Sequence, residues 1–379
     1  MTGLAPRGLL FLTPAVPPRP SLKGPSSCVF KKGALCAKLL GATPRGVFVE
    51  GGNMKTLVTG ASGFVGSHLV EALVSRGHEV RALVRKRSDR RWIHSLPVEF
   101  SIGDVSDPSS LEEAVKGVDW VFHVAGVTKA RGLSSYLRAN AQGTRNLLEA
   151  CWKRNRDLKR FVLLSSLAAW GPSSPHCPRE ETDECSPVSH YGFSKAMAEK
   201  ETCLYAGRLP VVILRPTAVY GPRDRDILAF FKMVKRGIFL RVGSGERYVC
   251  MIHVRDLVEG ILLAAVREVP SGSIYHLSDG CVRTWSEVAR TMAKVMDVHL
   301  REITIPVSLA KAVALLSEFS SAVTGRPPLF NRQKLREMLE DGWTCSIEKA
   351  RMDLGFRPRI PLEEGLRETY LWYKEMGWL

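Results

Sequence analysis

Two serines, a tyrosine and a lysine are placed so that they could carry out acid–base chemistry. Ser165 and Ser166 end an apolar run that begins at Phe161, and Tyr191 and Lys195 follow after a polar, proline-rich loop. Because four residues are about one helical turn, Tyr191 and Lys195 should share one face of a helix. A cation beside a phenol favours the phenolate, so we predict that Tyr191 transfers a proton near neutral pH. Taken alone, the same spacing also fits a surface tyrosine and a solvated lysine.

A glycine-rich turn earlier in the chain predicts a phosphate site. Gly60, Gly63 and Gly66 are spaced G-x-x-G-x-x-G between a short β pattern at residues 55–59 and a helical pattern that starts at Phe64. Small residues let the backbone approach a pyrophosphate, and a helix N-terminus attracts its negative charge. The strand–turn–helix context therefore predicts a dinucleotide site.

The end of the second predicted strand favours NADP(H) over NAD(H). An NAD site usually has an acidic residue there, which holds the ribose 2′-hydroxyl. Here Val84 is followed by Arg85, Lys86, Arg87 and Ser88. We predict that Arg85 binds a 2′-phosphate with help from its neighbours. NAD(H) stays the alternative cofactor, since an exposed basic loop without a ligand would have the same composition.

Strand and helix patterns alternate over the first half of the chain. The expected strands are residues 55–59, 78–84, 98–102, 119–124 and 159–165, and the expected helices are residues 64–76, 107–117 and 133–154. Strict alternation predicts an α/β fold with a Rossmann-type, doubly wound parallel sheet, which binds ligands at the carboxyl ends of its strands. We place the nucleotide-binding domain at residues 54–222. A smaller, mostly helical substrate lobe, interleaved with late Rossmann elements, is expected at residues 223–379.

Composition narrows the class of protein. Hydrophobic residues make up 45% and charged residues 24% of the chain, which is typical of globular proteins. No apolar run approaches the roughly 20 residues of a membrane span, and the nine cysteines lack metal-ligand spacing. We therefore predict a cytoplasmic protein without an integral membrane segment or a metal. The net charge of +16 suits an anionic cofactor or substrate, but no basic run interleaved with aromatic residues indicates nucleic acid.

Residues 1–53 form a distinct N-terminal segment. They hold seven basic residues and one acidic residue, many prolines and glycines, and no sustained periodicity. Such a segment cannot bury enough surface to fold alone, so we expect it to be disordered. The codons for Glu50-Gly51-Gly52 would resemble a bacterial ribosome-binding sequence, and Met54 directly precedes the first strand. Our alternative hypothesis is that translation starts at Met54; a transit peptide fits the composition only loosely.

From Met54 onward the chain resembles the extended short-chain dehydrogenase/reductases. The motifs that carry the resemblance are TGASGFVG (59–66), GDVSD (103–107), HVAG (123–126), NAQGTRNLL (140–148), LLSS (163–166), YGFSK (191–195), RPTAVYGP (215–222) and HVRDLVEG (253–260). They follow one another with family-like spacing and cover nearly all of residues 54–379. The resemblance implies hydride transfer between a nicotinamide and a carbinol carbon.

The resemblance also implies roles for individual residues. Tyr191 would be the catalytic acid/base, and Ser166, rather than Ser165, would steady the reacting oxygen. Lys195 would lower the pKa of the tyrosine and hydrogen-bond the nicotinamide ribose, and Asn140 would belong to a proton relay. The implied cofactor-binding residues are Gly60, Ser62, Gly63, Phe64, Val65, Gly66, Arg85, Asp104, Val105, Ala125, Lys195, Pro216 and Val219.

The substrate class follows from one departure from the family pattern. Nucleotide-sugar enzymes of this family carry an arginine shortly before the H-V-x-D motif, but Val249 stands at that position and Arg247 lies in the wrong register for a strand. The chain looks more like the branch of dihydroflavonol reductases, 3β-hydroxysteroid dehydrogenases and hopanoid-associated relatives. We therefore predict an NADP(H)-dependent oxidoreductase that interconverts a carbonyl and an alcohol on a small, largely apolar molecule. The alternatives are a nucleotide-sugar epimerase or dehydratase, and a non-catalytic dinucleotide sensor.

The resemblance implies that substrate-binding groups come from residues 172–189, 224–250 and 305–343. The last segment contains an apolar helical pattern at residues 307–323 that includes Lys311 and Glu318. Its apolar residues fall mostly on one helix face, so we predict a core or lid helix. A homodimer through the long helices near Leu133 and Tyr191 is the assembly that the family suggests.

Overall fold

The computed structural model describes residues 52–174, 177–324 and 330–379. The segment 1–53 that was expected to be disordered lies outside these residues, apart from Gly52 and Asn53. Within the described residues, no helix is long and apolar enough to cross a membrane.

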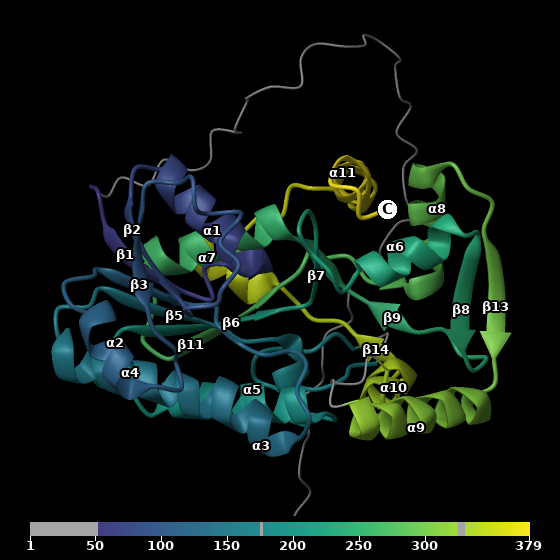
Figure 1. The fold of residues 1–379 in the computed structure, drawn as a ribbon, viewed down its shortest axis with the longest axis horizontal. Helices are drawn as coiled ribbons and strands as arrows, with labels where there is room; N and C mark the ends of the chain where they lie inside the picture. Colours follow the sequence, from purple (N-terminus) through teal and green to yellow (C-terminus); the bar gives the residue numbers. More distant parts are fainter. Residues whose placement is uncertain (1–51, 175–176, 325–329) are drawn as a thin grey trace, which may run out of the picture. The chain divides into compact units, whose positions relative to one another are not determined.

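A seven-stranded parallel sheet forms the centre of the nucleotide-binding half (Figure 1). Its strands are β1 (Lys55–Thr59), β2 (Glu79–Val84), β3 (Val98–Ile102), β4 (Trp120–His123), β5 (Arg160–Leu164), β6 (Val211–Pro216) and β11 (Ser273–Leu277). They lie in the order β11-β6-β5-β4-β1-β2-β3. The order reverses between β1 and β4, so the ligand crevice of a doubly wound sheet is expected at their carboxyl ends. The predicted fold class is confirmed.

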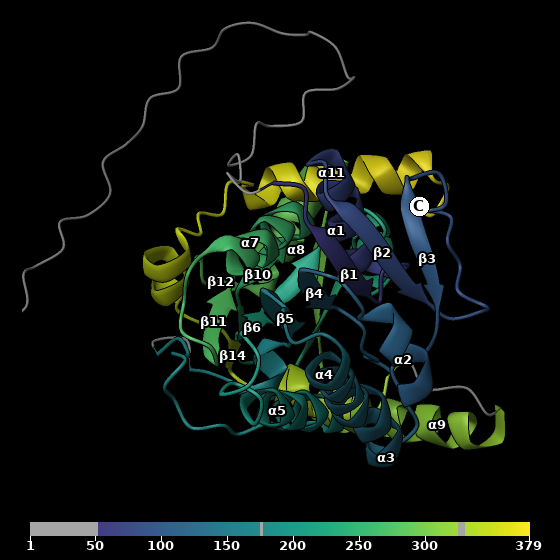
Figure 2. The same ribbon diagram turned by 90° about the vertical axis from the view of Figure 1, so that its left-hand side faces the viewer.

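Helices cover both faces of this sheet. α1 (Phe64–Ser75) and α7 (Val254–Val266) lie on one face, and α2 (Pro108–Ala114), α4 (Gly143–Arg154) and α5 (His190–Cys203) lie on the other (Figures 1 and 2). Side chains alternate along a strand, so neighbours in β1 belong to different layers. Leu57 packs with the residues under α2 and α4, whereas Val58 packs with those under α1 and α7.

The helix expected at residues 133–154 has an irregular middle. It consists of α3 (Leu133–Tyr136), a π-helical stretch η1 (Leu137–Gln142) and then α4. π-helical turns are rare and often occur at functional sites, because the extra residue per turn re-aims the side chains that follow. Asn140, a predicted site residue, lies within η1.

The C-terminal part adds a smaller lobe and returns twice to the main sheet, through α7 and β11. Its helices are α6 (Leu228–Lys235), α8 (Trp285–Met296), α9 (Val307–Thr324), α10 (Arg332–Leu339) and α11 (Leu362–Glu375). Its short strands are β7 (Ala218–Tyr220), β8 (Ile238–Val242), β9 (Tyr248–Val249), β10 (Met251–His253), β12 (Arg283–Thr284), β13 (Arg301–Ile305) and β14 (Gly342–Trp343). The short helices η2 (Leu167–Ala169) and η3 (Ala350–Leu354) complete the assignment.

A buried carboxylate fastens the last segment of the chain to the sheet. Asp256, in the first turn of α7, is 4% exposed and accepts hydrogen bonds from the backbone N–H groups of Arg359 (3.1 Å) and Ile360 (3.0 Å). Phe356 is fully buried in the same layer. The H-V-R-D motif and the closing segment are therefore parts of one structural contact.

Residues 307–323 were predicted to form a core or lid helix, and the core alternative is wrong. α9 is a helix, but the large apolar side chains along it are exposed, and only two alanines, Ala310 and Ala314, are fully buried among the side chains that the structure describes there. These alanines pack with Leu335 of α10 and Val242 of β8. The sequence pattern identified the apolar face correctly, but that face points away from the protein.

Candidate active site

The glycine turn closes tightly against the end of β4. Gly60 has a φ of +69°, and a Cβ placed on it would lie 2.7 Å from the backbone nitrogen of Ala125. A Cβ on Gly66 would lie 2.1 Å from the carbonyl oxygen of Gly60. α1 begins with Gly63 as its N-cap, and no side chain caps it. Its first backbone N–H groups can therefore bind a phosphate, and the residues present fit a dinucleotide.

A buried histidine links this turn to the π-helical stretch. The His123 ring lies 2.7 Å from Thr59 Oγ1 through Nδ1 and 2.9 Å from Thr144 Oγ1 through Nε2. Thr144 donates its hydroxyl proton to Asn140 O (2.6 Å), so it can only accept from His123 Nε2, and Nδ1 then accepts from Thr59. Burial lowers the pKa of His123 to about 3, which keeps the ring neutral. Sequence reasoning missed this chain, although the histidine of HVAG was part of a quoted motif.

Ser166 and Tyr191 meet because α5 packs directly on η2. A Cβ on Gly192 would lie 2.2 Å from Ala168 O, so only glycine permits this approach. Ser189 caps α5 by accepting a hydrogen bond from Gly192 N (3.1 Å), and Ser166 Oγ accepts one from Ala168 N (3.2 Å). The Ser166 hydroxyl lies close enough to the Tyr191 phenol to lower the pKa of that phenol by hydrogen bonding. The structure thus brings together two of the predicted catalytic side chains.

The effect that we predict for Lys195 on Tyr191 stays a prediction, because burial has the largest influence on the pKa of this phenol here. Burial raises the pKa of Tyr191 to about 12, and the hydrogen bond from Ser166 offsets only part of this rise. The Lys195 ammonium donates instead to Leu164 O at 2.7 Å. Burial lowers the pKa of Lys195 to about 8, against the opposing effect of the Glu199 carboxylate. Burial therefore shifts the pKa of each side chain in the direction that favours its neutral form.

Asn140 holds the segment after β4 against α5. Its Oδ1 accepts from Val127 N (2.8 Å), and its Nδ2 donates to Val127 O (3.1 Å) and to Ser194 Oγ (2.9 Å). A Cβ added to Gly126 would lie 3.3 Å from Asn140 Oδ1 and 3.5 Å from Lys195 Nζ, so the two side chains border the same backbone. The amide positions neighbouring groups, with no hydrogen bond to Tyr191 or Lys195 in this part of the structure.

A buried ion pair behind Lys195 was not anticipated. Arg215 of β6 donates three hydrogen bonds to the Glu199 carboxylate, at 2.6, 3.0 and 3.1 Å, and is 1% exposed. Ser165 Oγ donates to the same carboxylate at 2.5 Å, and the Trp170 ring stacks over the guanidinium with its centroid 3.7 Å away. The sequence did contain a signal for Glu199, because this residue continues the four-residue spacing of Tyr191 and Lys195.

The remaining predicted cofactor residues follow the carboxyl ends of other strands. Arg85, Lys86 and Arg87 line an open hollow after β2, and within the described ranges their side chains have no hydrogen-bond partner. Hydrogen bonds from the backbone and side chain of Ser106, together with Arg85, hold the pKa of Asp104 below its usual range. Val105 packs against Gly143 at the start of α4.

Pro216 ends β6 and is buried, and Val219 lies in β7, where it pairs with Ile252. Val249, which occupies the position of the family's diphosphate-binding arginine, is 1% exposed. Arg247 lies 3.8 Å from Asp341 instead. Among the residues that the structure describes, no group of three or more His, Cys, Asp or Glu side chains could hold a metal ion.

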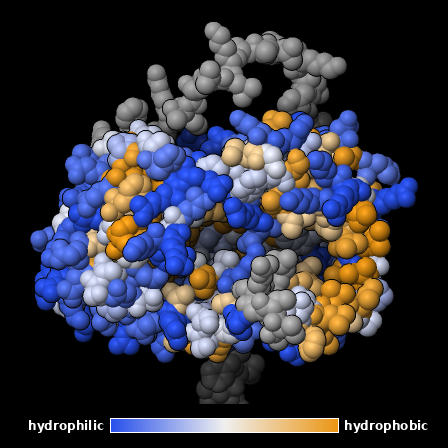
Figure 3. All heavy atoms as spheres, viewed as in Figure 1, coloured by the Kyte–Doolittle hydropathy of each residue, from blue (hydrophilic) through white to orange (hydrophobic). Residues whose placement is uncertain are grey.

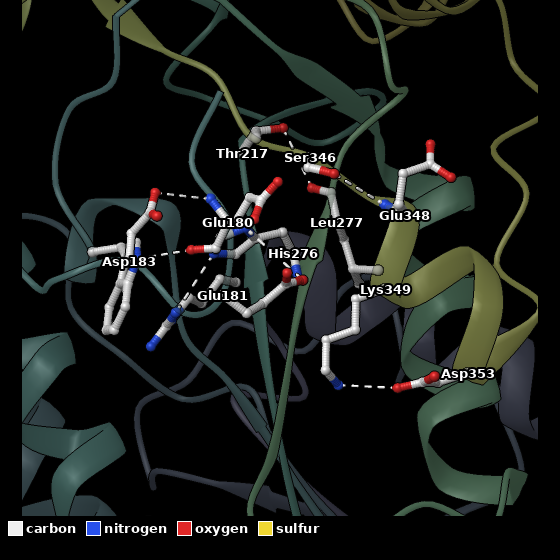
Figure 4. Close-up of polar contacts among 12 residues, drawn as sticks. Glu180, Glu181, Asp183, Thr217, His276, Leu277, Ser346, Glu348, Lys349 and Asp353 are labelled. Atoms are coloured by element: carbon white, nitrogen blue, oxygen red, sulfur yellow. Dashed lines mark hydrogen bonds and ion pairs between the residues drawn. The ribbon is translucent and has the colours of Figure 1, made fainter. Parts of the chain in front are cut away.

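The loop between Ser166 and Tyr191 is fastened to the C-terminal half. Arg179 pairs with Cys345 in a β-bridge, and the Glu181 carboxylate accepts a hydrogen bond from His276 N of β11 at 2.8 Å. Figure 4 shows Glu181 pointing toward His276, beside the turn that Asp183 closes by accepting from Glu180 N. These contacts hold the described part of the loop against the sheet.

α10, far along the chain, contacts the residue next to Tyr191. Gln333 accepts a hydrogen bond from His190 N (2.8 Å) and lies 2.6 Å from His190 Nδ1 through its amide nitrogen. The Glu337 carboxylate contributes to the raised pKa of Tyr191. Both residues are more than 140 positions from Tyr191. They lie within the segment 305–343 that was expected to supply substrate-binding groups, but neither of them was singled out.

The comparisons with known proteins agree with this geometry. Residues 56–278 match the NAD dependent epimerase/dehydratase family. A ceramide reductase from Caulobacter vibrioides is 36% identical over 85% of this chain and 95% of that protein. A 4-hydroxy-2-methyl-3-oxo-4-farnesyl-3,4-dihydroquinoline-1-oxide ketoreductase from Stigmatella aurantiaca is 30% identical over 83% of this chain and 95% of its own length.

Solved structures give the same result. MoeE5 in complex with UDP-glucuronic acid and NAD is 26% identical, has a TM-score of 0.69 and matches 85% of this chain and 99% of that one. One conclusion follows from the family match, the glycine turn that fits a dinucleotide and the Ser166–Tyr191 pair. The chain belongs to the NAD dependent epimerase/dehydratase family and is an NAD(P)-dependent enzyme of the extended short-chain dehydrogenase/reductase type.

Proposed function

We propose that the protein is an NADP(H)-dependent reductase that converts a carbonyl to an alcohol on a largely apolar molecule. The observation that carries the proposal is the placement of the Tyr191 phenol beside the Ser166 hydroxyl at the carboxyl end of β5. This end of the sheet also holds the glycine turn that fits a dinucleotide. A phenol beside a second hydroxyl at this position can give its proton to a carbonyl oxygen, which is general-acid catalysis.

Each side chain has a definite task in this reaction. The cofactor, when bound, supplies the hydride. Tyr191 donates its phenolic proton to the carbonyl oxygen of the substrate, and Ser166 hydrogen-bonds that oxygen and keeps it in place. Lys195, held by Leu164 O, would contact the nicotinamide ribose. Asn140 and His123 keep the backbone after β4 in the position that the cofactor needs, which is catalysis by orientation.

The preference for NADP(H) rests on the three cations after β2. Their side chains are exposed and unpaired among the described residues, and they line one hollow. A 2′-phosphate would give them charge-assisted hydrogen bonds. An acidic residue, which would favour the 2′-hydroxyl of NAD, is absent from residues 84–88.

The apolar substrate class has two supports. Val249 removes the arginine that would hold the diphosphate of a nucleotide sugar, and no other cation replaces it in β9. The two curated relatives described above carry names that refer to a ceramide and to a farnesyl-substituted ring, both of which include long apolar groups.

The test is turnover by Tyr191→Phe. We expect this variant to bind NADPH like the wild type, because the phenyl ring preserves packing, and to lose at least 10²-fold in kcat with a long-chain ketone, because the proton donor is gone. Stopped-flow absorbance at the NADPH band measures both properties. If the variant keeps most of its turnover, Tyr191 is not the acid and the proposal fails.

Nucleotide-sugar epimerisation is the second candidate, since MoeE5 was solved with a UDP sugar. Epimerisation leaves the cofactor unchanged overall, whereas reduction consumes NADPH. Incubation with UDP-glucose or UDP-glucuronic acid, followed by chromatography of the sugars, distinguishes the two. Formation of an epimer without net NADPH oxidation would favour this second reading.

A further inference from the structure

α9 is amphipathic, but its apolar face is the exposed one. Ala310 and Ala314 face the protein, whereas Leu309, Val313 and Leu316 are 52%, 48% and 70% exposed. The spacing of these three leaves one continuous stripe along the helix. Leu315 and Phe319, at 50% and 73% exposure, widen the stripe on one side. The arc of large apolar side chains lies opposite the two alanines, which is the reverse of an ordinary surface helix.

The apolar stripe continues onto the neighbouring strands. Leu240 of β8 and Ile303 of β13 are partners in the parallel ladder, so their side chains lie side by side, and they are 40% and 44% exposed. Figure 3 shows apolar side chains gathered over the part of the surface where Figure 1 places α9, β8 and β13. Single exposed leucines are normal, but a contiguous patch of this kind marks an interaction surface. We call it the α9 face.

The α9 face is connected to the catalytic residues through α10. Leu335 of α10 packs under Ala310 and Ala314, and Gln333 of the same helix holds His190, the residue next to Tyr191. Glu318 of α9 accepts two hydrogen bonds from Arg332, from the backbone N–H at 2.9 Å and from Nε at 2.8 Å, at the start of α10. The surface and the site are thus built on one helical pair.

Unpaired cations lie on or next to the elements that carry the α9 face. Lys235 and Arg236 come shortly before β8 and Arg301 begins β13, at the ends of these strands that lie away from α9 (Figure 1). Lys311 lies on α9 and Arg336 on α10. In the described ranges none of these five side chains has an acidic partner, and the chain as a whole carries a charge of +16. An apolar helix face with flanking basic residues favours the interface of a bilayer that contains anionic lipids.

We propose that the α9 face docks this enzyme on a phospholipid bilayer with anionic headgroups. α9 would lie in the plane of the interface with Leu316 and Phe319 among the acyl chains. Docking would serve the proposed function, and its biological sense rests on that function. An apolar carbonyl substrate would be concentrated in the membrane, and docking would hold α10 next to the membrane. The occupant is the lipid surface itself, not a second protein.

Vesicle flotation with the full-length chain tests this. Wild-type protein should float with vesicles of phosphatidylcholine and phosphatidylglycerol mixed in equal parts, and more weakly with phosphatidylcholine alone. In L316E/F319E two inserted apolar side chains are replaced by charges, so the bound fraction should fall at least about tenfold. The matched control is Leu371→Glu on α11, where the leucine is 56% exposed and lies outside the α9 face; it should float like the wild type.

The outcomes separate docking from the proposed chemistry. Absence of wild-type binding, or equal binding by L316E/F319E, overturns the docking proposal. A wild-type dimer that L316E/F319E dissociates, with no vesicle binding, overturns it too and makes the α9 face a contact between copies. If NADPH still raises the melting temperature of L316E/F319E, this variant is folded. If vesicles bind while NADPH and carbonyl substrates do not, the proposed function fails and docking stands.

Discussion

Replacing Glu199 with glutamine should destabilise the protein and disturb cofactor binding together. The Glu199 side chain is 6% exposed and the Arg215 side chain 1%. The carboxylate accepts three hydrogen bonds from the guanidinium and one from Ser165. Glutamine keeps the shape and one oxygen, but it leaves the positive charge of Arg215 in the interior without its counterion.

Breaking a buried pair by removing one partner costs about 3–5 kcal/mol, since a buried charge is left uncompensated. We expect a value near the lower end, about 3 kcal/mol, because the amide oxygen still accepts a hydrogen bond and the Trp170 ring still faces the guanidinium. At roughly 2 °C per kcal/mol for a domain of this size, Tm should fall by about 6 °C. Ser165, which donates to the same carboxylate, keeps a partner in the amide oxygen.

The matched control is Glu363→Gln. Glu363 pairs with Lys294 at 2.7 Å and with Arg367 at 3.1 Å, but its side chain is 40% exposed. Exposed ion pairs add little to stability because water screens the charges, so this variant should lose at most about 2 °C. Differential scanning calorimetry of both variants decides the matter. If Glu199→Gln melts no lower than Glu363→Gln, the buried pair does not stabilise the fold as argued.

The same substitution has a consequence for pH dependence. Burial lowers the pKa of Lys195 to about 8 although the Glu199 carboxylate raises it. Without the carboxylate this pKa falls further, so the ammonium loses its proton at a lower pH. If the charged ammonium contacts the nicotinamide ribose, the alkaline decline in NADPH affinity should move toward acid in Glu199→Gln. An unchanged affinity profile would show that Lys195 acts in its neutral form or does not touch the cofactor.

Two further substitutions test the nucleotide site. Arg85→Asp should raise the Kd for NADPH by about 30-fold, because one charge-assisted contact is lost. The Kd for NADH should stay within about twofold of the wild-type value. An unchanged ratio of the two dissociation constants would refute the choice of NADP(H). Gly66→Ala places a Cβ 2.1 Å from Gly60 O. This substitution should weaken NADPH binding at least about tenfold by overpacking the turn. The control is Gly207→Ala, whose added Cβ meets nothing within 4 Å, and it should bind NADPH normally. Equal NADPH affinities of the two variants would contradict the turn geometry.

Much of the fold could be predicted because parallel strands are buried on both faces and form short apolar runs. Residues 161–164 illustrate this, and β5 occupies them as expected. The role of Asp107 as an N-cap could be predicted too. Its side chain accepts a hydrogen bond from Ser109 N and caps α2 before Pro108. The π-helical stretch was not predictable, because a single extra residue within a helix leaves no distinct pattern in the sequence.

The site was only partly predictable for a related reason. Gly60 and Tyr191 belong to local motifs, and local spacing reveals them. Gln333 and His276 enter through tertiary contacts across 143 and 95 positions of the chain. The prediction of a core helix at residues 307–323 failed for another reason. Periodicity locates an apolar stripe, such as that of Leu316, but does not say whether the protein or something else covers it.

The contacts around Lys195 explain how one helix can serve both stability and chemistry. α5 carries Tyr191, Lys195 and Glu199 at four-residue spacing, so these three side chains leave one face of the helix one above another. The first reaches Ser166 beyond β5, the second reaches Leu164 O within it, and the third reaches Arg215 of β6. A shift of α5 along its axis would break all three contacts at once. The buried ion pair therefore helps to fix the position of Tyr191, although Glu199 lies eight residues further along the helix.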